Sequence, residues 1–324
     1  MVVVLISSPS GKRPAVVERF ASLGWEVRQA RLGPDTPPGE VIETVRDVDG
    51  VLAHIEPYTR QVLEHTPRLR VLSRAGVGYD AIDVGAATER RIAVCTSIGS
   101  NDRTVADYAV LLMLALARNL IPGHAQVFER GGFERPLGVD VFGKTVGIVG
   151  TGAIGKQVAQ RMRAFDCRLL GYDVVQDAAF AASTGLQYVS LEALLRESDF
   201  VTLHLPLLSA TLHLIGAEQL GWMRPSAYLV NTARGPLIDE TALAGALAQG
   251  QLAGAGLDVF ETEPLSPDSP LRRLPNVILT PHNAGGTHEA TTRSGDMAAD
   301  SIVRVLQGER PRSCVNPEVF DAPA

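Results

Sequence analysis

The 324-residue sequence has little cysteine, few aromatic residues and almost no lysine. Its 3 cysteines (Cys95, Cys167 and Cys314) form neither a CxxC pair nor a disulfide framework, so we interpret them as incidental thiols of a reducing compartment. Only three of the 30 basic residues are lysines, and the 36 acidic residues leave a net charge of -6. The arginines are dispersed along the chain, which argues against a nucleic-acid partner because such a partner needs a concentrated basic surface.

Long hydrophobic runs are also missing. The most apolar segment, Tyr108 to Ala117, is far shorter than the roughly 20 residues that cross a bilayer. Met1 is followed directly by an apolar run, without the basic segment and cleavage site of a secretory signal. The histidines show no metal-ligand spacing such as HExxH. We therefore expect a cytoplasmic protein without a membrane partner and without a metal.

Short apolar runs alternate with helical patterns along the chain. This alternation predicts an α/β fold with parallel, doubly wound sheets, and the length favours two domains. The GPDTPPG segment (33–39) is typical of a surface loop, and the long apolar pattern over 101–119 predicts a helix buried on most sides. The expected strands of the first hundred residues span 2–6, 25–28, 50–54, 69–73 and 92–95, and the expected helices span 15–22, 60–65 and 84–90.

A glycine-rich loop stands between a predicted strand (146–149) and a predicted helix (156–165), and its sequence is Gly150-Thr151-Gly152-Ala153-Ile154-Gly155. In dinucleotide-binding units the first glycine allows a tight turn, the second lets pyrophosphate approach the backbone, and the third lets the helix pack on the strand. The N–H groups at the start of the helix then face the phosphates. The loop therefore predicts a dinucleotide site that includes Ala153 and Ile154.

An acidic residue follows the next predicted strand (168–172). Asp173 lies 18 residues past Gly155, where a carboxylate accepts hydrogen bonds from the ribose hydroxyls and repels a 2′-phosphate. Val174 and Val175 offer no cation to hold such a phosphate. We therefore predict NAD over NADP, the alternative being a plain turn or capping aspartate.

Three later strands (227–230, 255–259 and 277–280) are each followed by a loop with one polar residue of chemical interest. These residues are Arg234, Glu263 and His282. Because the carboxyl ends of parallel strands meet at one edge of the sheet, beside the glycine loop, we expect the three side chains to converge there. His204 ends a strand at the same edge, and we expect it to line the site without acting as an acid.

These residue types suit the interconversion of a 2-keto acid and a 2-hydroxy acid. The planar fork of arginine binds a carboxylate and the neighbouring carbonyl oxygen. Histidine protonates that oxygen as hydride reaches the carbon, or removes the proton in the reverse direction. A glutamate against the imidazole fixes its tautomer and favours its protonated form. Taken singly, each residue is more often an ion-pair partner, a loop acid or a turn residue, so the shared sheet edge carries the prediction.

The sequence resembles the D-isomer-specific 2-hydroxyacid dehydrogenases, in particular their phosphoglycerate dehydrogenase-like branch, over nearly its whole length. The resemblance implies that Arg234, Glu263 and His282 form the catalytic trio. The last three of the segments that carry it, in this order, are highly specific. These segments are RAGVGYDAID (74–83), NDRTVAD (101–107), VGIVGTGAIG (146–155), MRPSAYLVNTARG (223–235), GLDVFETEPL (256–265) and TPHNAGGT (280–287).

The resemblance also implies an architecture of two doubly wound parallel-sheet domains. A flavodoxin-like substrate domain would contain residues 1–99 and 285–324, and a Rossmann NAD-binding domain, residues 100–284, would be inserted between them. Dimerisation through the NAD-binding domain and the 101–119 helix would make the protein a homodimer.

The resemblance assigns further residues to substrate and cofactor. The backbone N–H groups of Val77 and Gly78 would bind the substrate carboxylate, with Arg74 nearby, because glycines leave the backbone open to an anion. Asp258 matches the residue that contacts the nicotinamide carboxamide. The other expected cofactor-binding residues are Thr104, Leu205, Thr232, Ala233 and Gly285.

Departures from the phosphoglycerate dehydrogenase pattern favour a small, unphosphorylated substrate. Ala53-His54 stands where those enzymes usually carry Arg-Ser, and Glu56 would repel a phosphate. Arg74 is retained, but one arginine beside an acid is a poor site for a dianion. We expect hydroxypyruvate, glyoxylate or a relative, with D-3-phosphoglycerate as the alternative. The sequence also ends before the regulatory ACT domain that some relatives append, and Asp107 replaces the family's more usual glutamate.

Other functions fit parts of the pattern. NAD(H)-responsive corepressors of this superfamily can keep the trio, but the sequence lacks long tails or an extra basic segment. Formate dehydrogenase-like relatives pair the histidine with an amide, whereas Glu263 is a carboxylate. Phosphite oxidation is a further alternative, although the rest of its pocket pattern is not evident.

Overall fold

The computed structural model describes residues 1–321, and the chain divides into two compact units. The first unit contains Met1–Asn101 and the returning segment from Gly286 onward, and the second contains Asp102–Gly285. The sequence-based division placed the two breaks after residues 99 and 284. The substrate and NAD-binding roles of the units stay predictions.

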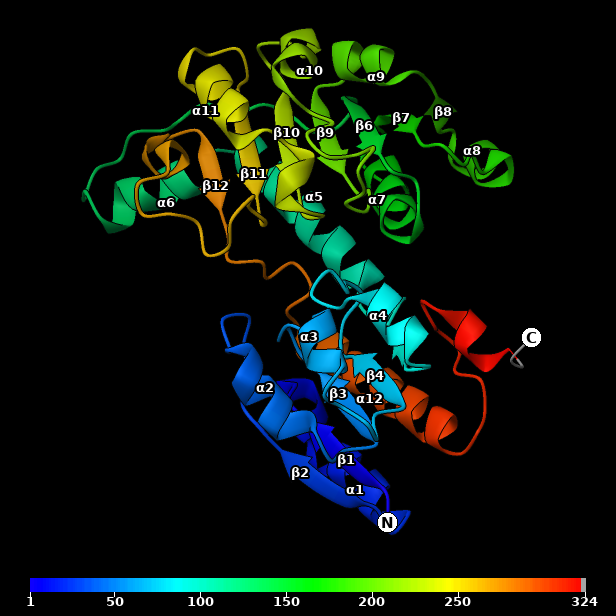
Figure 1. Cartoon of the computed structure of the whole chain (residues 1–324). Helices are drawn as coiled ribbons and strands as arrows, with labels where there is room; N and C mark the ends of the chain where they lie inside the picture. The colour runs from blue at the N-terminus through cyan, green and yellow to red at the C-terminus, as the bar shows by residue number, and fades with distance from the viewer. Residues whose placement is uncertain (322–324) are drawn as a thin grey trace. The chain divides into compact units, whose positions relative to one another are not determined.

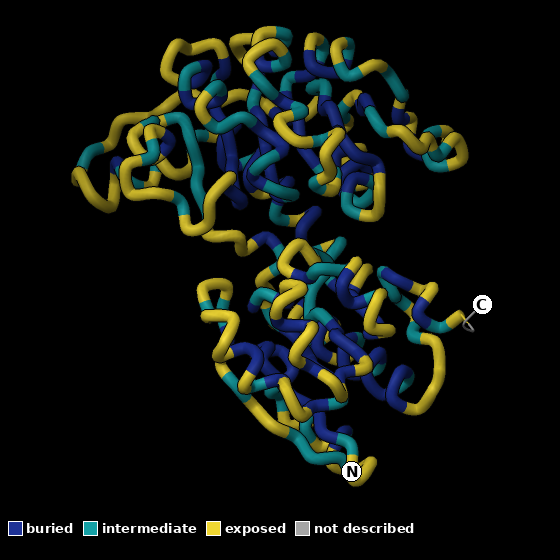
Figure 2. The backbone as a smooth tube through the Cα atoms, in the orientation of Figure 1, coloured by how far each residue is buried: buried dark blue, intermediate teal, exposed yellow. Residues whose placement is uncertain are grey.

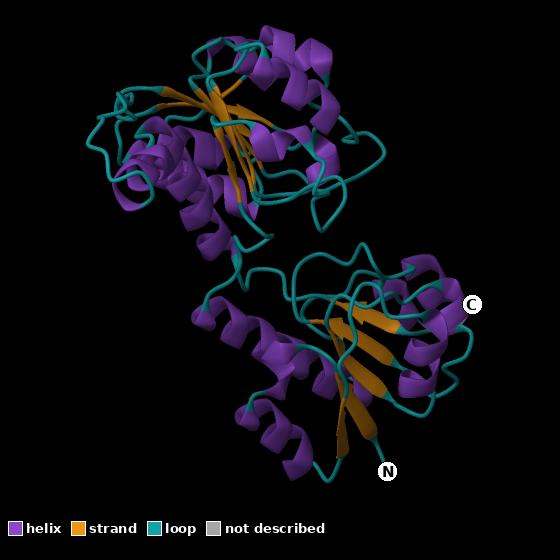
Figure 3. Cartoon of the chain, turned by 90° about the vertical axis from the view of Figure 1, so that its left-hand side faces the viewer, coloured by secondary structure: helices purple, strands orange, loops and turns teal. Residues whose placement is uncertain are grey.

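The first unit is a parallel five-stranded sheet with the strand order β2-β1-β3-β4-β5, which is the flavodoxin-like order of doubly wound folds. Helices cover both faces of the sheet (Figure 3). Its elements are β1 (Val3–Ile6), α1 (Pro14–Ser22), β2 (Glu26–Gln29), α2 (Pro38–Val45), β3 (Gly50–Ala53), α3 (Arg60–Leu63), β4 (Val71–Arg74), α4 (Val84–Glu89), β5 (Ala93–Cys95) and α12 (His288–Leu306) (Figure 1).

The second unit is a parallel seven-stranded sheet with the order β12-β11-β10-β9-β6-β7-β8. This is the Rossmann order: β7 and β8 are added on one side of β6, and from β9 onward the strands are added on its other side. The switch point lies between β6 and β9. Its elements are α5 (Asp102–Ala117), α6 (Leu120–Phe128), β6 (Thr145–Val149), α7 (Ala153–Arg163), β7 (Arg168–Tyr172), α8 (Ala178–Thr184), β8 (Gln187–Tyr188), α9 (Leu191–Glu197), β9 (Phe200–Leu203), α10 (Ala217–Trp222), β10 (Tyr228–Asn231), α11 (Glu240–Ala248), β11 (Gly254–Leu257) and β12 (Val277–Leu279).

Each sheet separates two hydrophobic cores. In β1, for example, Val3 and Leu5 pack with the α2 and α3 side chains, whereas Val4 and Ile6 pack with α1 and α12. Strands covered on both faces need continuous apolar runs, and the central strands β1 and β3 are accordingly fully buried (Figure 2). The predicted fold class of two doubly wound parallel-sheet domains is confirmed.

Some expected element boundaries were wrong. Helix α7 begins at Ala153 and not at residue 156. The start was misplaced because Gly152, its N-cap, has no side chain that would mark the beginning of a helix. Helix α2 begins at Pro38, inside the segment expected to be a loop, and proline is well suited to a first helical turn.

The helix expected over 101–119 ends earlier, at Ala117, and is buried along much of its length. Asn119 then adopts a left-handed backbone conformation with φ of 48°, and α6 follows it. Among residues 1–321, no single helix is long and apolar enough to cross a membrane. Helices α5 and α6 meet the length and composition requirement only when taken together, and they are bent by 64° at the break.

Candidate active site

The loops after β10 and β11 meet at the carboxyl edge of the seven-stranded sheet. Gly235 lies so close to the second loop that a Cβ there would be 1.8 Å from the carbonyl carbon of Phe260. Only glycine permits this approach. The contact places the segment that carries Arg234 against the segment that leads to Glu263.

Asn231 shapes the turn that carries Arg234. Its side chain is fully buried, its Oδ1 accepts a hydrogen bond from the Ala233 N–H at 3.0 Å, and its Nδ2 donates to the Arg234 carbonyl at 2.8 Å. The Arg234 guanidinium donates to the Ala233 carbonyl at 2.8 Å. The backbone of the turn is therefore fixed by a buried amide.

The loop after β12 brings His282 to the same place. Nδ1 of His282 lies 2.7 Å from Oε2 of Glu263. Because a carboxylate only accepts hydrogen bonds, Nδ1 carries the proton in this pair, and Nε2 remains for another partner. Arg234, Glu263 and His282 thus come from three separate loops and gather at one sheet edge.

Asp258, at the end of β11, holds the His282 loop. Its carboxylate is fully buried and accepts hydrogen bonds from the Thr280 hydroxyl at 2.6 Å and from the N–H groups of Asn283 and Ala284 at 2.9 and 2.8 Å. The backbone of His282 has a φ of 50° and donates to the Asp258 carbonyl at 2.8 Å. The left-handed conformation costs free energy in a non-glycine residue, and the Asp258 hydrogen bonds compensate for that cost.

The charge of Glu263 is stabilised by its neighbours. Partial burial raises the pKa of Glu263. The hydrogen bond from His282, the His282 charge, the Phe260 N–H and the Arg234 charge lower this pKa, and together they outweigh the effect of burial. The net pKa lies below its ordinary value, so Glu263 is a carboxylate at neutral pH. Arg234 therefore acts electrostatically on the same pair.

The glycine loop lies at the switch point between β6 and β9. Gly150 has a φ of 95°, and a Cβ there would lie 2.7 Å from the backbone of His204. A Cβ at Gly155 would lie 2.0 Å from the Gly150 carbonyl oxygen. At Gly152, by contrast, a Cβ would have nothing within 4 Å, so this N-cap of α7 leaves open space next to free N–H groups.

Asp173 is tied to the glycine loop. Its Oδ2 accepts hydrogen bonds from the N–H of Thr151 at 2.7 Å and from the Thr151 hydroxyl at 3.2 Å. The next two side chains, Val174 and Val175, are uncharged and are 90% and 76% exposed. This turn therefore supplies no cation for a 2′-phosphate. Lys156, which begins the second turn of α7, is paired with Asp177 at 2.5 Å.

Two buried polar atoms at this edge lack a hydrogen-bond partner among the described residues: Nδ1 of His204 and the Thr232 hydroxyl. They follow β9, which borders the switch point, and β10, which is the next strand in the sheet. Buried polar groups are nearly always satisfied, so atoms of this kind fit a site that takes a polar ligand. Together with the open space at Gly152, they fit a bound dinucleotide.

The carboxyl edge of the first unit carries a second cluster. Glu56 is only 1% exposed, and its carboxylate accepts hydrogen bonds from the hydroxyls of Ser7 at 2.5 Å and Tyr58 at 2.9 Å and from the His54 N–H at 3.2 Å. From the sequence, Glu56 was predicted only to repel a phosphate. Its hydrogen bond from Ser7 was not predicted, because the two residues are 49 positions apart.

His54 in this cluster is uncharged near neutral pH. Burial lowers its pKa, and the nearby charges of Arg74 and Lys12 act in the same direction, whereas Glu56 opposes them. Arg74 folds back over its own turn, so that a Cβ at Gly76 would lie 2.8 Å from its guanidinium. Lys12, which no sequence pattern marks, donates to the Ala30 carbonyl at 2.6 Å.

The roles of the other predicted site residues stay predictions. Thr104, Leu205, Ala233 and Gly285 are half-buried in the second unit, and Val77 and Gly78 are half-buried in the first. Asp107, the departure from the usual glutamate, accepts a hydrogen bond from Arg161 at 2.6 Å and so links α5 to α7.

Comparisons with known proteins give the site its context. Residues 110–284 match the family model described as D-isomer specific 2-hydroxyacid dehydrogenase, NAD binding domain. A glyoxylate reductase of Korarchaeum cryptofilum is 44% identical over 88% of this chain and 88% of its own length. The chain belongs to the D-isomer specific 2-hydroxyacid dehydrogenase family.

Two further relatives agree with this assignment. A D-3-phosphoglycerate dehydrogenase of Methanocaldococcus jannaschii is 40% identical over 98% of this chain, which spans 60% of that protein. The crystal structure of the TT0316 protein from Thermus thermophilus has a TM-score of 0.87 at 34% identity and covers 97% of this chain and 100% of that one. As a D-2-hydroxyacid dehydrogenase, the protein is an oxidoreductase that uses NAD.

Proposed function

We propose that this dehydrogenase interconverts glyoxylate or hydroxypyruvate with the corresponding 2-hydroxy acid, and that Arg234, Glu263 and His282 perform the reaction. The observation that carries the proposal is the 2.7 Å pair of His282 and Glu263 beside the Arg234 turn. General acid–base catalysis needs a proton donor whose tautomer is fixed, and the Glu263 carboxylate fixes it.

The residues have distinct roles in this proposal. Arg234 binds the substrate carboxylate and carbonyl oxygen through its planar fork. His282 holds a proton at Nε2 and delivers it to that oxygen in reduction, or takes it back in oxidation. Glu263 keeps Nδ1 protonated and compensates the positive charge of the imidazolium.

The cofactor would be held by residues of the second unit. Bound NAD supplies or accepts the hydride. Gly150 and Gly152 would leave the backbone open to its pyrophosphate, with Ala153, Ile154 and Gly155 at the helix start. Asp173 would accept hydrogen bonds from its ribose hydroxyls. The remaining proposed cofactor contacts are Thr104, Leu205, Thr232, Ala233, Asp258 and Gly285.

At the edge of the first unit, the backbone of Val77 and Gly78 and the Arg74 side chain would bind the substrate carboxylate. His54 is neutral and the Glu56 carboxylate is occupied by three donors, so this cluster offers polar contacts for a small hydroxyl or aldehyde group. The 44% identity to a glyoxylate reductase supports the same substrate class.

The second candidate substrate is D-3-phosphoglycerate. Lys12 and Arg74 both act on His54 electrostatically, and two cations could serve a phosphate. The 40% identity to a D-3-phosphoglycerate dehydrogenase also favours it. We rank this candidate second because Ala53 and His54 replace the Arg-Ser pair and Lys12 already donates to the Ala30 carbonyl.

Steady-state assays of the purified enzyme distinguish the two. Loss of NADH absorbance is followed with glyoxylate, hydroxypyruvate and pyruvate, and NADH formation is followed with D-glycerate and D-3-phosphoglycerate. We expect the highest kcat/KM with glyoxylate or hydroxypyruvate. A kcat/KM for D-3-phosphoglycerate far above that for D-glycerate would refute the substrate assignment, and an inactive enzyme that binds NADH would favour a corepressor-like role.

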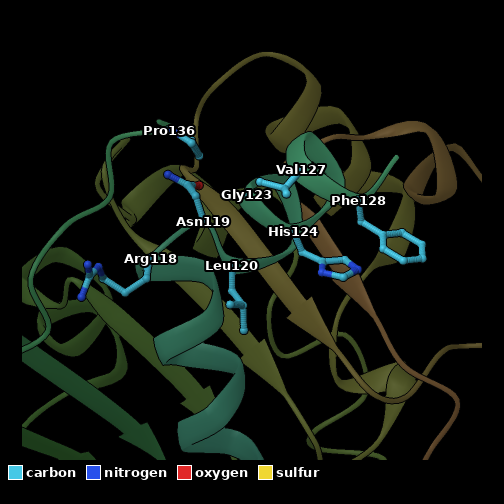
Figure 4. Close-up of a pocket in the computed structure, with 8 residues that line it drawn as sticks. All are labelled: Arg118, Asn119, Leu120, Gly123, His124, Val127, Phe128 and Pro136. Atoms are coloured by element: carbon cyan, nitrogen blue, oxygen red, sulfur yellow. The ribbon is translucent and has the colours of Figure 1, made fainter. Parts of the chain in front are cut away.

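We further propose that the enzyme is a cytoplasmic homodimer that associates through the second unit. The segment from α6 to residue 142 exposes several large apolar side chains, of which Phe128, Phe133 and Leu137 are 78%, 77% and 93% exposed. Exposed apolar surface of this extent is typical of an interface. Figure 4 shows a pocket in the same region, lined by residues that follow α5, by α6 and by the loop after α6: Arg118, Asn119, Leu120, Gly123, His124, Val127, Phe128 and Pro136.

The mass in solution tests this association. Light scattering after gel filtration is expected to give twice the chain mass of 34.6 kDa for the wild type, and a Phe128→Glu, Leu137→Glu variant is expected to be monomeric. Leu212→Glu serves as the control, because Leu212 is also exposed, at 55%, but lies outside the segment. A monomeric wild type, or a dimeric double variant, contradicts the proposal.

A further inference from the structure

Two of the cysteines face each other at the outer edge of the first sheet. β5 is the last strand of that sheet, and the segment after α12 returns along it so that Cys314 forms an antiparallel bridge with Cys95. The Val315 N–H donates to the Val94 carbonyl at 2.8 Å. Because this bond joins the residues that flank the pair, Cys95 and Cys314 form a non-hydrogen-bonded pair, the kind in which Cα atoms are typically about 4.5 Å apart.

That separation is within the range of roughly 4.4–6.8 Å that a disulfide spans. The register is fixed by Asn316, whose buried side chain accepts from the Val94 N–H at 2.8 Å and donates to the Ile92 carbonyl at 2.9 Å. On the other side, the hydroxyls of Thr96 and Ser313 are 3.1 Å apart. The backbone is therefore held on both sides of the cysteine pair.

The two thiols differ in reactivity. Cys95 is fully buried, whereas Cys314 is partly exposed. The hydrogen bond between the thiols lowers the pKa of Cys314 to about 7 and raises the pKa of Cys95, which burial raises further. Cys314 is thus the more acidic and the more exposed of the two thiols, and the thiolate is the form that attacks oxidants.

We propose that Cys314 is a site of reversible oxidation by hydrogen peroxide and that Cys95 is its resolving thiol. The Cys314 thiolate attacks a peroxide oxygen, the O–O bond breaks, and a sulfenic acid and hydroxide form. The Cys95 sulfur then attacks the sulfenic sulfur, the S–S bond forms, and the hydroxyl leaves with the Cys95 proton as water. The pair loses two electrons and the peroxide is reduced; a dithiol reverses the step by exchange.

The disulfide would join the C-terminal segment to β5 across 219 residues of sequence. Two residues beyond Cys95, Ser97 holds the predicted substrate turn: its N–H donates to the Gly76 carbonyl at 2.8 Å and its hydroxyl to the Arg74 carbonyl at 3.1 Å. The bond would stabilise this edge of the sheet, because it constrains the unfolded chain.

Thiol counting with mass spectrometry tests the proposal on the full-length enzyme. Reduced protein is treated with hydrogen peroxide at pH 7.5 and alkylated, and its intact mass and peptides are measured. We expect the number of alkylated cysteines to fall from three to one, with peptides containing Cys95 and Cys314 joined and with recovery after dithiothreitol. Cys167→Ser is the matched control and should still lose two thiols.

Cys314→Ser should keep both remaining thiols, and because Cys314 is only partly buried it is the safer variant if Cys95→Ser fails to fold. Oxidation should also raise the melting temperature of the wild type by several degrees and leave that of Cys314→Ser unchanged. The proposal is overturned if Cys95 and Cys314 stay alkylatable while Cys167 reacts, if Cys314 proceeds to sulfinic acid without a cross-link, or if oxidation lowers the melting temperature.

Discussion

The Nδ1 atom of His282 lies 2.7 Å from Oε2 of Glu263, although the two side chains are 51% and 37% exposed. Exposed ion pairs contribute little to the free energy of folding, so neither burial nor the attraction between the two side chains fixes this geometry. Its geometry comes from the backbone: the buried Asp258 carboxylate fixes the His282 loop, and Gly235 lets the Arg234 turn lie against the Phe260 backbone. A site built in this way is sensitive to changes in the loops beneath it.

His282→Gln should lower kcat by about 10²–10⁴-fold, the usual contribution of a general acid. The Kd for NADH, measured by fluorescence titration, should stay unchanged because the substitution leaves the glycine loop intact. Glu263→Gln keeps a hydrogen-bond acceptor for Nδ1 but removes the charge, so we expect a smaller loss of kcat. A Glu263→Gln variant as inactive as His282→Gln would show that charge, and not orientation, is the main contribution.

Gly235→Ala tests the contact between the two loops. The added Cβ would lie 1.8 Å from the Phe260 carbonyl carbon, and overpacking typically costs about 1–3 kcal/mol. We expect the free energy of unfolding and kcat to fall together. Gly245→Ala is the control, because Gly245 lies within α11 and has nothing within 4 Å of the added Cβ; it should stabilise the protein by up to about 1 kcal/mol.

Urea unfolding of both glycine variants can be followed through Trp222, which lies in the second unit, in a Trp25→Phe background. If Gly235→Ala unfolds at the wild-type urea concentration and keeps its kcat, the close approach of the loops does not matter for the site.

Asp173→Asn should reduce the preference for NADH over NADPH. Asparagine can still accept the Thr151 N–H, but it no longer repels a 2′-phosphate, and removing one nearby like charge is worth roughly 1 kcal/mol, or several-fold in Kd. Asp177→Asn removes an acid that pairs with Lys156 instead, so the ratio of the two Kd values should not change. A wild type that binds NADPH more tightly than NADH contradicts the role of Asp173.

Rules of topology made the fold and part of the site predictable from the sequence. Apolar runs between helical patterns predicted both parallel sheets, and the loops after parallel strands must leave at one edge. That is enough to gather Arg234, Glu263 and His282 without any distance information. Gly150 and Gly155 were predictable too, because a strand–glycine–helix unit leaves few other packings.

Contacts between residues far apart in sequence were not predictable. The Ser7 hydroxyl that satisfies Glu56 lies 49 residues away, and Cys314 lies 219 residues from Cys95. No local pattern marks such pairs, since each depends on how a returning segment packs. The start of α7 was missed for a different reason: Gly152 gives no capping signal, although its backbone begins the helix.

His204 should make the second unit sensitive to acid. Burial lowers its pKa to about 3, whereas an unfolded histidine titrates near 6.5. Between these values the unfolded chain binds a proton that the folded chain excludes. The stability is therefore full above pH 6.5 and declines as the pH falls toward 3, by about 1.4 kcal/mol per pH unit for one proton.

Urea unfolding at pH 7.5, 6 and 5, followed through Trp222, measures this decline. His204→Gln keeps an amide near the Thr202 hydroxyl, which lies 2.9 Å from the His204 ring, but it has no titrating group. Its loss of stability between pH 7.5 and 5 should be smaller than that of the wild type. His65→Gln, which removes an exposed histidine of the first unit, should follow the wild-type curve. Equal acid sensitivity of wild type and His204→Gln would mean that His204 takes up a proton in the folded state, and its unpartnered Nδ1 would then be reached by water.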